Sequence, residues 1–349
     1  TSFDEPADAV RIQDRTGGLE IDGYSQPGSR VNTATVGSNA IPGVELRGSG
    51  GSPRNNAFRI TSPNNIIRGF LLNNHYRSIF LDGPDAHHNV IAGNLIGYLR
   101  DGSVSSYRGN HGVRLNVGAH HNYIGTPALA DRNVIGQFTH AIDLYGPGTD
   151  SNVIQNNLLC MTPSGMGEAT CSTGIDHNFG PKSNLEGGLG TNEKNIIGRT
   201  TLNGIEVSHG WDRDHVDFST KWQNNNNRVI GNWIGFRGDG SYRASFRSGQ
   251  NNPNSNDQNG INFYDGSNFN LAEGNWIASV WDGINLMSPN STGNTVRNNI
   301  IGESPLGQAA PLGRYGINVR NNTRSNVIEG NTIRHAGVYG IALTQKDVL

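Results

Sequence analysis

A short segment of the form small–apolar–any–apolar recurs along this chain, and this repeat limits the possible folds more than any other feature. The usual spacing between copies is roughly 23 to 34 residues, which is the length range of stacked-repeat proteins. One gap, from Gly204 to Gly260, is about twice as long. The copies begin at Ser78, Gly112, Ala141, Gly174, Gly204, Gly260, Gly283, Gly316 and Gly340.

A second repeat lies between copies of the first and reads Asn–apolar–apolar–any–Gly/Asn–Asn–any–apolar, as in Asn89–Ile96 and Asn152–Leu159. Both repeats alternate over only a few residues, which indicates short strands, and Gly and Asn mark the turns between them. Two or three strands per repeat, always in the same order, predict one coil of a parallel β-helix. We expect the recurring asparagines to form hydrogen-bonded ladders from coil to coil.

The alternative, a β-sandwich or propeller, would show longer strands and antiparallel hairpins with two-residue turns, and this chain shows neither. The prediction is therefore an all-β, single-domain β-helix of about 9–11 coils with inserted loops. The domain spans residues 1–349, with opening coils in 1–63, regular coils in 64–343 and a long inserted region in 210–258.

The repeats, from about Asn64 to Leu343, resemble those of the right-handed parallel β-helix superfamily. This superfamily includes pectate lyases, polygalacturonases, alginate epimerases and inulin fructotransferase. The segment from Ile21 to Ser29 resembles the first coil of many secreted bacterial β-helix proteins. The resemblance implies a right-handed solenoid and a carbohydrate-active protein.

Composition narrows the partners. The formal net charge is −2 and 16% of residues are charged, with no basic stripe of the kind that nucleic-acid binders carry. No apolar run approaches the length of a membrane span. We therefore expect no nucleic-acid or membrane partner. The abundant glycines and amides suit a surface that binds a polysaccharide or oligosaccharide through hydrogen bonds, and the oligomeric state is left open.

The two cysteines, Cys160 and Cys171, lie close together around a polar, turn-rich loop. We predict a disulfide between them, which would stabilise the fold by roughly 2–3 kcal/mol on the chain-entropy estimate. Because disulfides persist in oxidising compartments, this pair predicts a secreted, extracellular protein. Two cysteines alone do not make a zinc site.

Three carboxylates occupy the same position in successive repeats: Asp143, Asp176 and Glu206. In the predicted register the preceding isoleucines point inward, so these three residues point outward and stack at about 4.8 Å per coil. The whole outward column reads Phe80, Arg114, Asp143, Asp176, Glu206, Asn262, Asn285, Asn318 and Ala342.

Stacked carboxylates repel one another, so a chain usually keeps them for catalysis or for a cation. Glycosidases use two carboxyl groups, about 5–5.5 Å apart in retaining and about 6.5–9.5 Å apart in inverting enzymes, and the column offers both spacings. We expect the mutual repulsion to raise the pKa of at least one member and so create a general acid. The alternative is a solvated acidic face without a function.

Several residues near the column are predicted to assist it. Arg114, His177 and His209 would orient substrate or tune pKa values, although His177 occupies a core position and so either points inward or marks a bulge. Asp212 would be a further acid in the inserted loop. The residues predicted to bind substrate are Tyr145, Trp211, Asn262, Tyr264 and Asp265.

The sequence favours a secreted polysaccharide-degrading glycoside hydrolase, or a related glycosyl-transferring enzyme, with Asp143, Asp176 and Glu206 as catalytic residues and with no cofactor or metal. One alternative is a polysaccharide lyase or C5-epimerase acting on uronic-acid chains, in which the acids would hold Ca²⁺. Another alternative is a β-helix that binds glycans without enzymatic activity.

Overall fold

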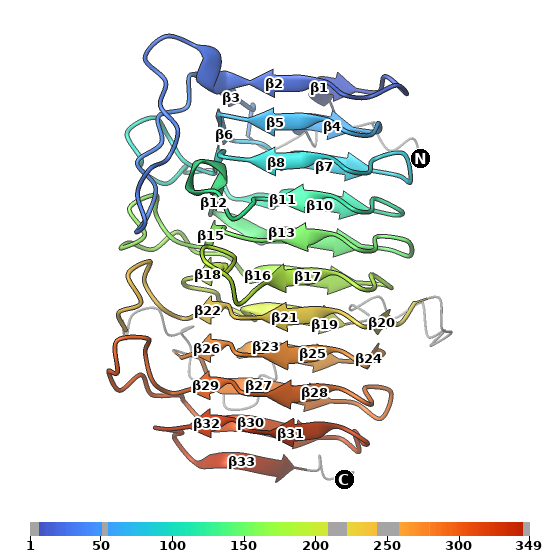
Figure 1. The fold of residues 1–349 in the computed structure, drawn as a ribbon, viewed down its shortest axis with the longest axis vertical. Helices are drawn as coiled ribbons and strands as arrows, with labels where there is room; N and C mark the ends of the chain where they lie inside the picture. Colours follow the sequence, from blue (N-terminus) through green and yellow to red (C-terminus); the bar gives the residue numbers. More distant parts are fainter. Residues whose placement is uncertain (1–6, 51–54, 209–221, 243–257, 279, 345–349) are drawn as a thin grey trace.

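The computed structural model describes residues 7–50, 55–208, 222–242, 258–278 and 280–344. Three parallel sheets of 11, 10 and 10 strands stack along one axis, and the chain visits them in the same order in every coil (Figure 1). The predicted right-handed parallel β-helix is confirmed, and the described residues form ten three-stranded coils followed by the first strand of an eleventh.

The strands of sheet 1 are the longest and carry the column of acids. They are β1 (Ala7–Ile12), β4 (Asn55–Ile60), β7 (Arg77–Asp82), β10 (Gly109–Asn116), β13 (Phe138–Tyr145), β16 (Thr173–Asn178), β19 (Ile205–Ser208), β23 (Asn259–Tyr264), β27 (Asp282–Met287), β30 (Tyr315–Arg320) and β33 (Tyr339–Thr344).

Sheets 2 and 3 consist of two- to four-residue strands. Sheet 2 contains β2 (Glu20–Asp22), β5 (Ile66–Arg68), β8 (Val90–Ala92), β11 (Tyr123–Ile124), β14 (Val153–Ile154), β17 (Leu185–Gly187), β21 (Arg228–Ile230), β25 (Leu271–Glu273), β28 (Thr295–Arg297) and β31 (Val327–Glu329). Sheet 3 contains β3 (Val44–Arg47), β6 (Phe70–Asn73), β9 (Leu95–Ile96), β12 (Val134–Ile135), β15 (Leu158–Leu159), β18 (Ile196–Ile197), β22 (Trp233–Ile234), β26 (Trp276–Ile277), β29 (Ile300–Ile301) and β32 (Thr332–Ile333). The short strands β20 (Asn224–Asn225) and β24 (Ser267–Asn268) pair separately, and two 3-10 turns, η1 (Gly23–Ser25) and η2 (Leu129–Asp131), are the helical elements among the described residues.

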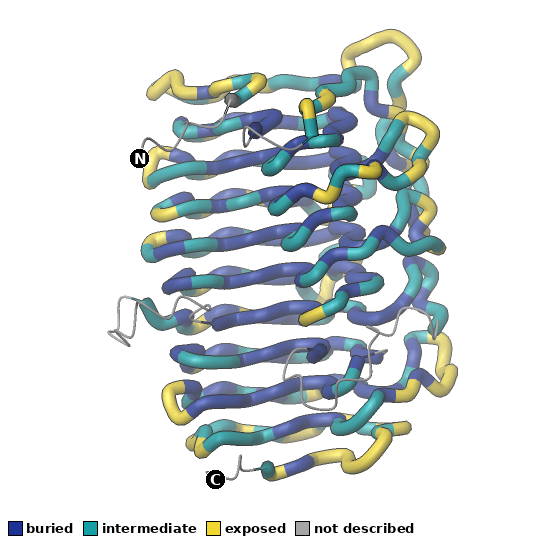
Figure 2. The backbone as a smooth tube through the Cα atoms, turned by 180° about the vertical axis from the view of Figure 1, so that it is seen from behind, coloured by how far each residue is buried: buried dark blue, intermediate teal, exposed yellow. Residues whose placement is uncertain are grey.

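The core consists of apolar side chains that stack from coil to coil inside the solenoid. In sheet 1, Val113, Ile142, Ile175 and Ile205 follow one another in register, and each is fully buried. Figure 2 shows this buried interior as a continuous dark band along the coils. Because each coil covers only its neighbours, the position of an inward residue fixes the face of the residue that follows it.

Two asparagine ladders line the corners between the sheets, as the repeats predict. One ladder lies between sheets 1 and 2, where successive side-chain amides donate to the next rung at 2.9–3.2 Å. Its rungs are Asn65, Asn89, Asn122, Asn152, Asn184, Asn227, Asn270, Asn294 and Asn326. The second ladder lies between sheets 2 and 3 and runs from Asn94 to Asn331 at 2.9–3.3 Å.

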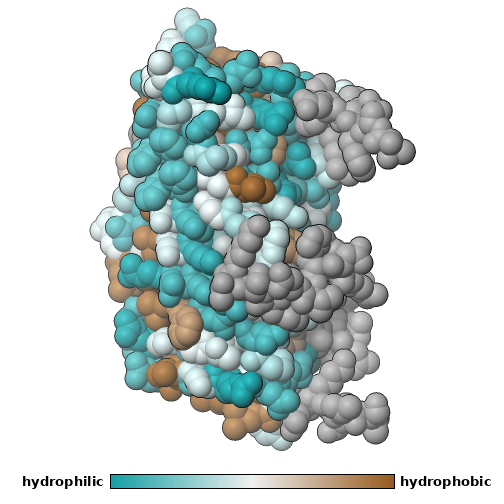
Figure 3. Space-filling view, turned by 90° about the vertical axis from the view of Figure 1, so that its right-hand side faces the viewer, coloured by the Kyte–Doolittle hydropathy of each residue, from teal (hydrophilic) through white to brown (hydrophobic). Residues whose placement is uncertain are grey.

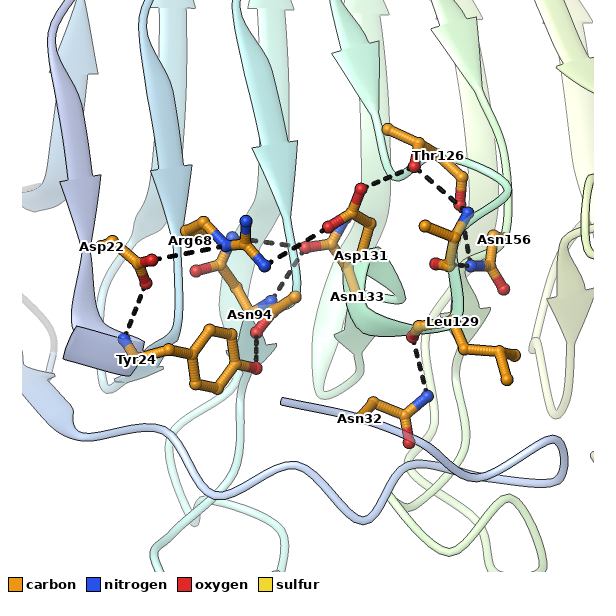
Figure 4. Close-up of polar contacts among 12 residues, drawn as sticks. Asp22, Tyr24, Asn32, Arg68, Asn94, Thr126, Leu129, Asp131, Asn133 and Asn156 are labelled. Atoms are coloured by element: carbon orange, nitrogen blue, oxygen red, sulfur yellow. Dashed lines mark hydrogen bonds and ion pairs between the residues drawn. The ribbon is translucent and has the colours of Figure 1, made fainter. Parts of the chain in front are cut away.

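The long connection between β2 and β3 crosses the outside of this second corner (Figure 4). The side-chain amide of Asn32 donates to the carbonyl of Leu129 at 2.9 Å, two coils beyond the neighbouring coil. The guanidinium of Arg132 donates to the carbonyls of residues 34, 35 and 37 in the same connection. These contacts tie the first coil to the middle of the stack.

The predicted disulfide is present. Cys160 and Cys171 are bonded at the corner between sheets 3 and 1, with both side chains fully buried against the core. Within the described part of the chain, no helix has the length and apolarity needed to span a bilayer.

Candidate functional site

The strand register places the predicted column in one line on sheet 1. Arg114 pairs with Asp143, Asp143 with Asp176, and Asp176 with Glu206 on successive strands. The line continues through Asn262, Asn285 and Asn318. The three carboxylates therefore lie on consecutive coils, on the opposite side of the strands from the isoleucine core.

The three carboxylates are buried, although they lie on the outer side of the sheet. Asp143 is 1% exposed, Asp176 is 3% exposed and Glu206 is 7% exposed. The residues contacting them include histidines, an arginine and amides from the same sheet, which replace water as hydrogen-bonding partners. The outward orientation is therefore as predicted, whereas the alternative of a solvated acidic face does not fit the burial of the three side chains.

Asp143 is held as an anion by two basic side chains. One carboxylate oxygen lies 3.1 Å from Nε2 of His111 and 3.2 Å from a terminal nitrogen of Arg114. Burial alone would raise the pKa of Asp143, but Arg114 and His111 outweigh burial and hold that pKa well below its usual range. The expectation that repulsion creates a general acid therefore fails at Asp143, because the cation beside it counts for more than the neighbouring carboxylate.

Asp176 pairs with a histidine that the sequence analysis missed. Nδ1 of His140 lies 2.8 Å from Oδ2 of Asp176, and the amide of Asn178 donates to the same oxygen at 2.7 Å. Asn178 also donates to Asp143 at 3.2 Å, so one amide nitrogen contacts both carboxylates and places their oxygens within about 6 Å of each other. The other oxygen of Asp176, Oδ1, is buried and has no hydrogen-bond partner among the described residues.

His140 and His111 stack face to face with ring centroids 5.4 Å apart, yet their pKa values move in opposite directions. For His140, burial lowers the pKa, but Asp176, together with Asp143 and Glu206, raises it to about 9. For His111, burial outweighs the attraction of Asp143, and the pKa falls to about 4. At neutral pH the site therefore contains a charged histidine next to a neutral one.

A shared position in the repeats is the signal that could have found both histidines. Each lies three positions before the column residue of its own strand, His111 before Arg114 and His140 before Asp143. In the Glu206 coil this position holds Asn203, whose amide donates to Oε2 of Glu206. Asn203 in turn accepts from the amide of Asn259 on the next strand at 2.9 Å.

Aromatic side chains lie on the other flank of the column. The guanidinium of Arg114 lies 4.3 Å from the ring centroid of Tyr145, which is half-buried. The Tyr145 ring lies 5.2 Å from Phe179, and Phe179 makes an edge contact with Trp222 at 6.5 Å. The repeat pattern indicated Tyr145 and Arg114 but not Phe179 and Trp222, which lie in turns beyond the strands.

The structure removes His177 from the outer face, whereas Asn262 is the register neighbour of Glu206 in the column. His177 points into the core, where Nε2 lies 3.0 Å from Oε1 of Glu186 and both side chains are fully buried, so His177 cannot contact a substrate on the outer face. Asp265 lies in the turn after β23 and accepts a hydrogen bond from Ser288 at 2.8 Å. Tyr264 is half-buried at the end of β23, and Asn262 bonds to the amide of Asn285 at 2.7 Å.

Three further predicted residues, His209, Trp211 and Asp212, lie outside the described residues, as does most of the inserted region 210–258.

Comparisons with known proteins agree with the class of fold. The chain is a right-handed parallel β-helix protein, and a family profile described as "Periplasmic copper-binding protein (NosD)" matches residues 192–348. No curated protein matches the chain.

Solved structures that resemble it include two structures of a GH87 α-1,3-glucanase catalytic domain and one of a tailspike protein. The glucanase domain bound to tetrasaccharides is 15% identical with a TM-score of 0.43 and covers 95% of this chain, and the one bound to nigerose is 13% identical with a TM-score of 0.42 over 87%. The Dettilon tailspike protein is 16% identical with a TM-score of 0.38 over 97%. This chain spans 62%, 56% and 60% of the length of those three chains, respectively.

Proposed function

We propose that this protein is a carbohydrate-active enzyme of the glycoside hydrolase type, with its reacting groups on the outer face of sheet 1. The observation that carries the proposal is the buried, unpartnered oxygen Oδ1 of Asp176, flanked in register by Asp143 and Glu206. A buried carboxylate oxygen without a hydrogen bond costs stability, so its retention points to a role in binding or reaction.

Different roles follow from the surroundings of each acid. Asp143 is fixed as an anion by Arg114 and His111, so it serves as an electrostatic support. Asp176 and Glu206 form the pair that would flank a scissile glycosidic bond, one giving a proton to the leaving oxygen and the other attacking or activating water. His140, charged at neutral pH, holds Asp176 in position and balances its charge.

The covered column sets a condition on substrate binding. Asn178 and Tyr145 lie beside the acids and are only half-buried, whereas the acids are buried, so these two side chains would move aside or pack against the sugar. The half-buried rings of Tyr145 and Trp222, both in contact with the buried ring of Phe179, supply apolar faces of the kind on which sugar rings stack.

A secreted or periplasmic location belongs to the same proposal. The disulfide between Cys160 and Cys171 supports an oxidising compartment, and a polysaccharide substrate would be met outside the cytoplasm.

A uronic-acid lyase or epimerase is the second candidate, because Arg114 places a cation beside the acids on the same face. Such an enzyme needs a positive group to neutralise the uronate, or a Ca²⁺ ion held by carboxylates. Arg114 and His140 already balance Asp143 and Asp176, so a calcium ion would have to compete with both of these side chains.

The deciding experiment is the product mass after incubation with a panel of neutral and uronic-acid polysaccharides. Products that carry an added water support hydrolysis, and unsaturated products support elimination. Activity should vanish in Asp176→Asn and Glu206→Gln, while Glu329→Gln, an exposed acid on the outer side of sheet 2, should behave as wild type. Full activity in both site variants would refute the assignment of the site.

A further inference from the structure

Four histidines gather at the turns between sheets 1 and 2. The turn between β7 and β8 and the turn one coil later, between β10 and β11, both contain the sequence Ala-His-His-Asn. The ring of His87 stacks on that of His120 with centroids 4.9 Å apart and planes 13° from parallel. The ring of His88 stacks on that of His121 at 5.2 Å and 9°. Figure 3 views the side of the molecule on which these turns project.

Within each turn, the two imidazoles bring the same ring nitrogen together. Nδ1 of His87 lies 2.9 Å from Nδ1 of His88, and Nδ1 of His120 lies 2.8 Å from Nδ1 of His121. Two imidazole nitrogens bound at about 2.0 Å to one metal ion lie roughly 2.8–3.0 Å apart at a 90° angle and about 3.3 Å apart at a tetrahedral angle. Each separation is a hydrogen-bond distance, and it also equals the nitrogen–nitrogen distance of the 90° arrangement, which is typical of Cu²⁺ and Ni²⁺.

The solenoid does not require histidine at these positions. The residue before each rung of the first asparagine ladder has a positive φ, which is 55° at His88 and 54° at His121. Neighbouring coils satisfy the same backbone conformation with Asn64 at 59°, Ser151 at 58° and Ser183 at 57°. Two adjacent coils therefore carry a histidine, His88 or His121, at a position where the turn also accepts asparagine or serine.

The surroundings of the cluster favour ligation. His88 and His121 are exposed, and His87 and His120 are half-buried, so an ion from solvent can reach both pairs. All four histidines lie outside the part of the chain that matches the NosD profile, residues 192–348.

We propose that each histidine pair, His87 with His88 and His120 with His121, binds one divalent transition-metal ion of tetragonal preference, such as Cu²⁺. Among the described residues no three His, Cys, Asp or Glu side chains converge on one ion, so water or an external ligand fills the remaining positions. Because the rings of the two pairs stack about 5 Å apart, two bound cations repel, and the second ion binds more weakly than the first. This site is independent of the carboxylates proposed for catalysis.

The test is a titration of the whole chain with Cu²⁺, followed by calorimetry and by electron paramagnetic resonance. We expect two ions per chain with coupling to imidazole nitrogens. His88→Asn and His121→Ser introduce residues that neighbouring coils already carry at this φ, and each should remove one ion. Their combination should remove both. His335→Asn changes another exposed histidine at positive φ, 49°, and should leave both ions bound.

Retention of both ions in the folded double variant would overturn the proposal, as would a wild-type Cu²⁺ spectrum without imidazole coupling. Circular dichroism checks the fold of each variant. A second measurement needs no variant: Cu²⁺ should protect the peptides containing residues 87–88 and 120–121 from modification by diethyl pyrocarbonate. Equal modification of these peptides with and without Cu²⁺ would also refute the site.

Discussion

The same line of positions on sheet 1 contains two different segments. The acid segment comprises Asp143, Asp176 and Glu206, and the amide segment comprises Asn262, Asn285 and Asn318 on the coils that follow. In the amide segment, the amide of Asn285 donates to Asn262 at 2.7 Å, and the amide of Asn318 donates to Asp282 at 2.9 Å. The acid segment instead needs Arg114, His111 and His140 as charged or donating partners.

This difference shows what the fold requires at this position. A parallel β-helix can fill the column with amides, which need no counter-charge, so the coil does not demand carboxylates here. The acid segment buries charge and recruits a row of basic side chains to compensate for it, which is costly unless the charge has a use. Substitutions in the acid and amide segments test this contrast.

Conversion of the acid segment toward amides should eliminate turnover and retain the fold. Asp176→Asn and Glu206→Gln should each lower kcat by about 10³-fold or more, because each removes a group that must exchange a proton or attack the sugar. Steady-state kinetics on the substrate identified by product mass, with circular dichroism as a check of folding, measures this effect. Wild-type rates would mean that the acid segment is a structural feature like the amide segment.

The interior pair His177–Glu186 offers a second contrast, between charge inside and outside the solenoid. Both side chains are fully buried, in line with Leu144 and Val207 for His177, and with Ile154 and Val229 for Glu186. Glu186→Ala should destabilise the fold by about 3–5 kcal/mol, because it leaves a buried imidazole without its partner.

The double replacement His177→Leu with Glu186→Ile, which copies the preceding coil, should restore stability or exceed the wild type. Urea unfolding of His177→Leu, Glu186→Ile and the double variant measures the coupling between the two sites. Additive losses in the double variant would show that the pair does not act as a unit.

The stacked histidines predict a pH dependence with two opposite limbs. The pKa of His140 is raised from 6.5 to about 9, so its stabilising contribution is complete below about pH 6.5 and is lost as the pH rises through about 9. The pKa of His111 is lowered to about 4, so that histidine opposes stability as the pH falls from 6.5 toward 4. The combined contribution of His140 and His111 to the free energy of unfolding should therefore be greatest near pH 6.5.

His140→Asn should cost roughly 2 kcal/mol near pH 6.5 and much less above pH 9, where the wild-type histidine is already neutral. Urea unfolding at both pH values, with His335→Asn as the control histidine, measures this difference. A loss of equal size at both pH values would mean that His140 acts through packing and not through its charge.

Much of the architecture could be predicted from the sequence, because the same local pattern recurs in every coil of a stacked-repeat protein. The isoleucines of sheet 1 fixed the register, and the register correctly aligned Asp143, Asp176 and Glu206. The asparagine ladders followed from the same periodicity. These features depend on neighbouring coils alone, and the sequence spacing gives the neighbours directly.

The environment of the column could not be predicted in the same way. Alternation places a side chain on the outer side of a strand, but it does not show whether His111, His140 and Asn178 will cover it. Phe179 and Trp222 lie in turns, where the repeat pattern ends. The sequence left the placement of His177 open. A histidine at a core position needs a buried partner, and the repeat pattern of sheet 1 does not show that Glu186, on sheet 2, is that partner.

The final prediction places an acid in the amide segment. Asn285 is fully buried, and its column neighbours, Asn262 and Asn318, are neutral amides. Asn285→Asp removes the donor to Asn262 and sets a carboxylate oxygen against an amide oxygen, so we expect a loss of about 1–3 kcal/mol in the free energy of unfolding. The loss should shrink as the pH falls toward 4, where the new carboxyl group is protonated and can donate again.

Urea unfolding at pH 7 and pH 4, compared with wild type at each pH, measures the change. If Asn285→Asp is as stable as wild type at pH 7, the column tolerates acids without basic partners, and the histidines and arginine around Asp143 and Asp176 would need a different explanation from charge compensation.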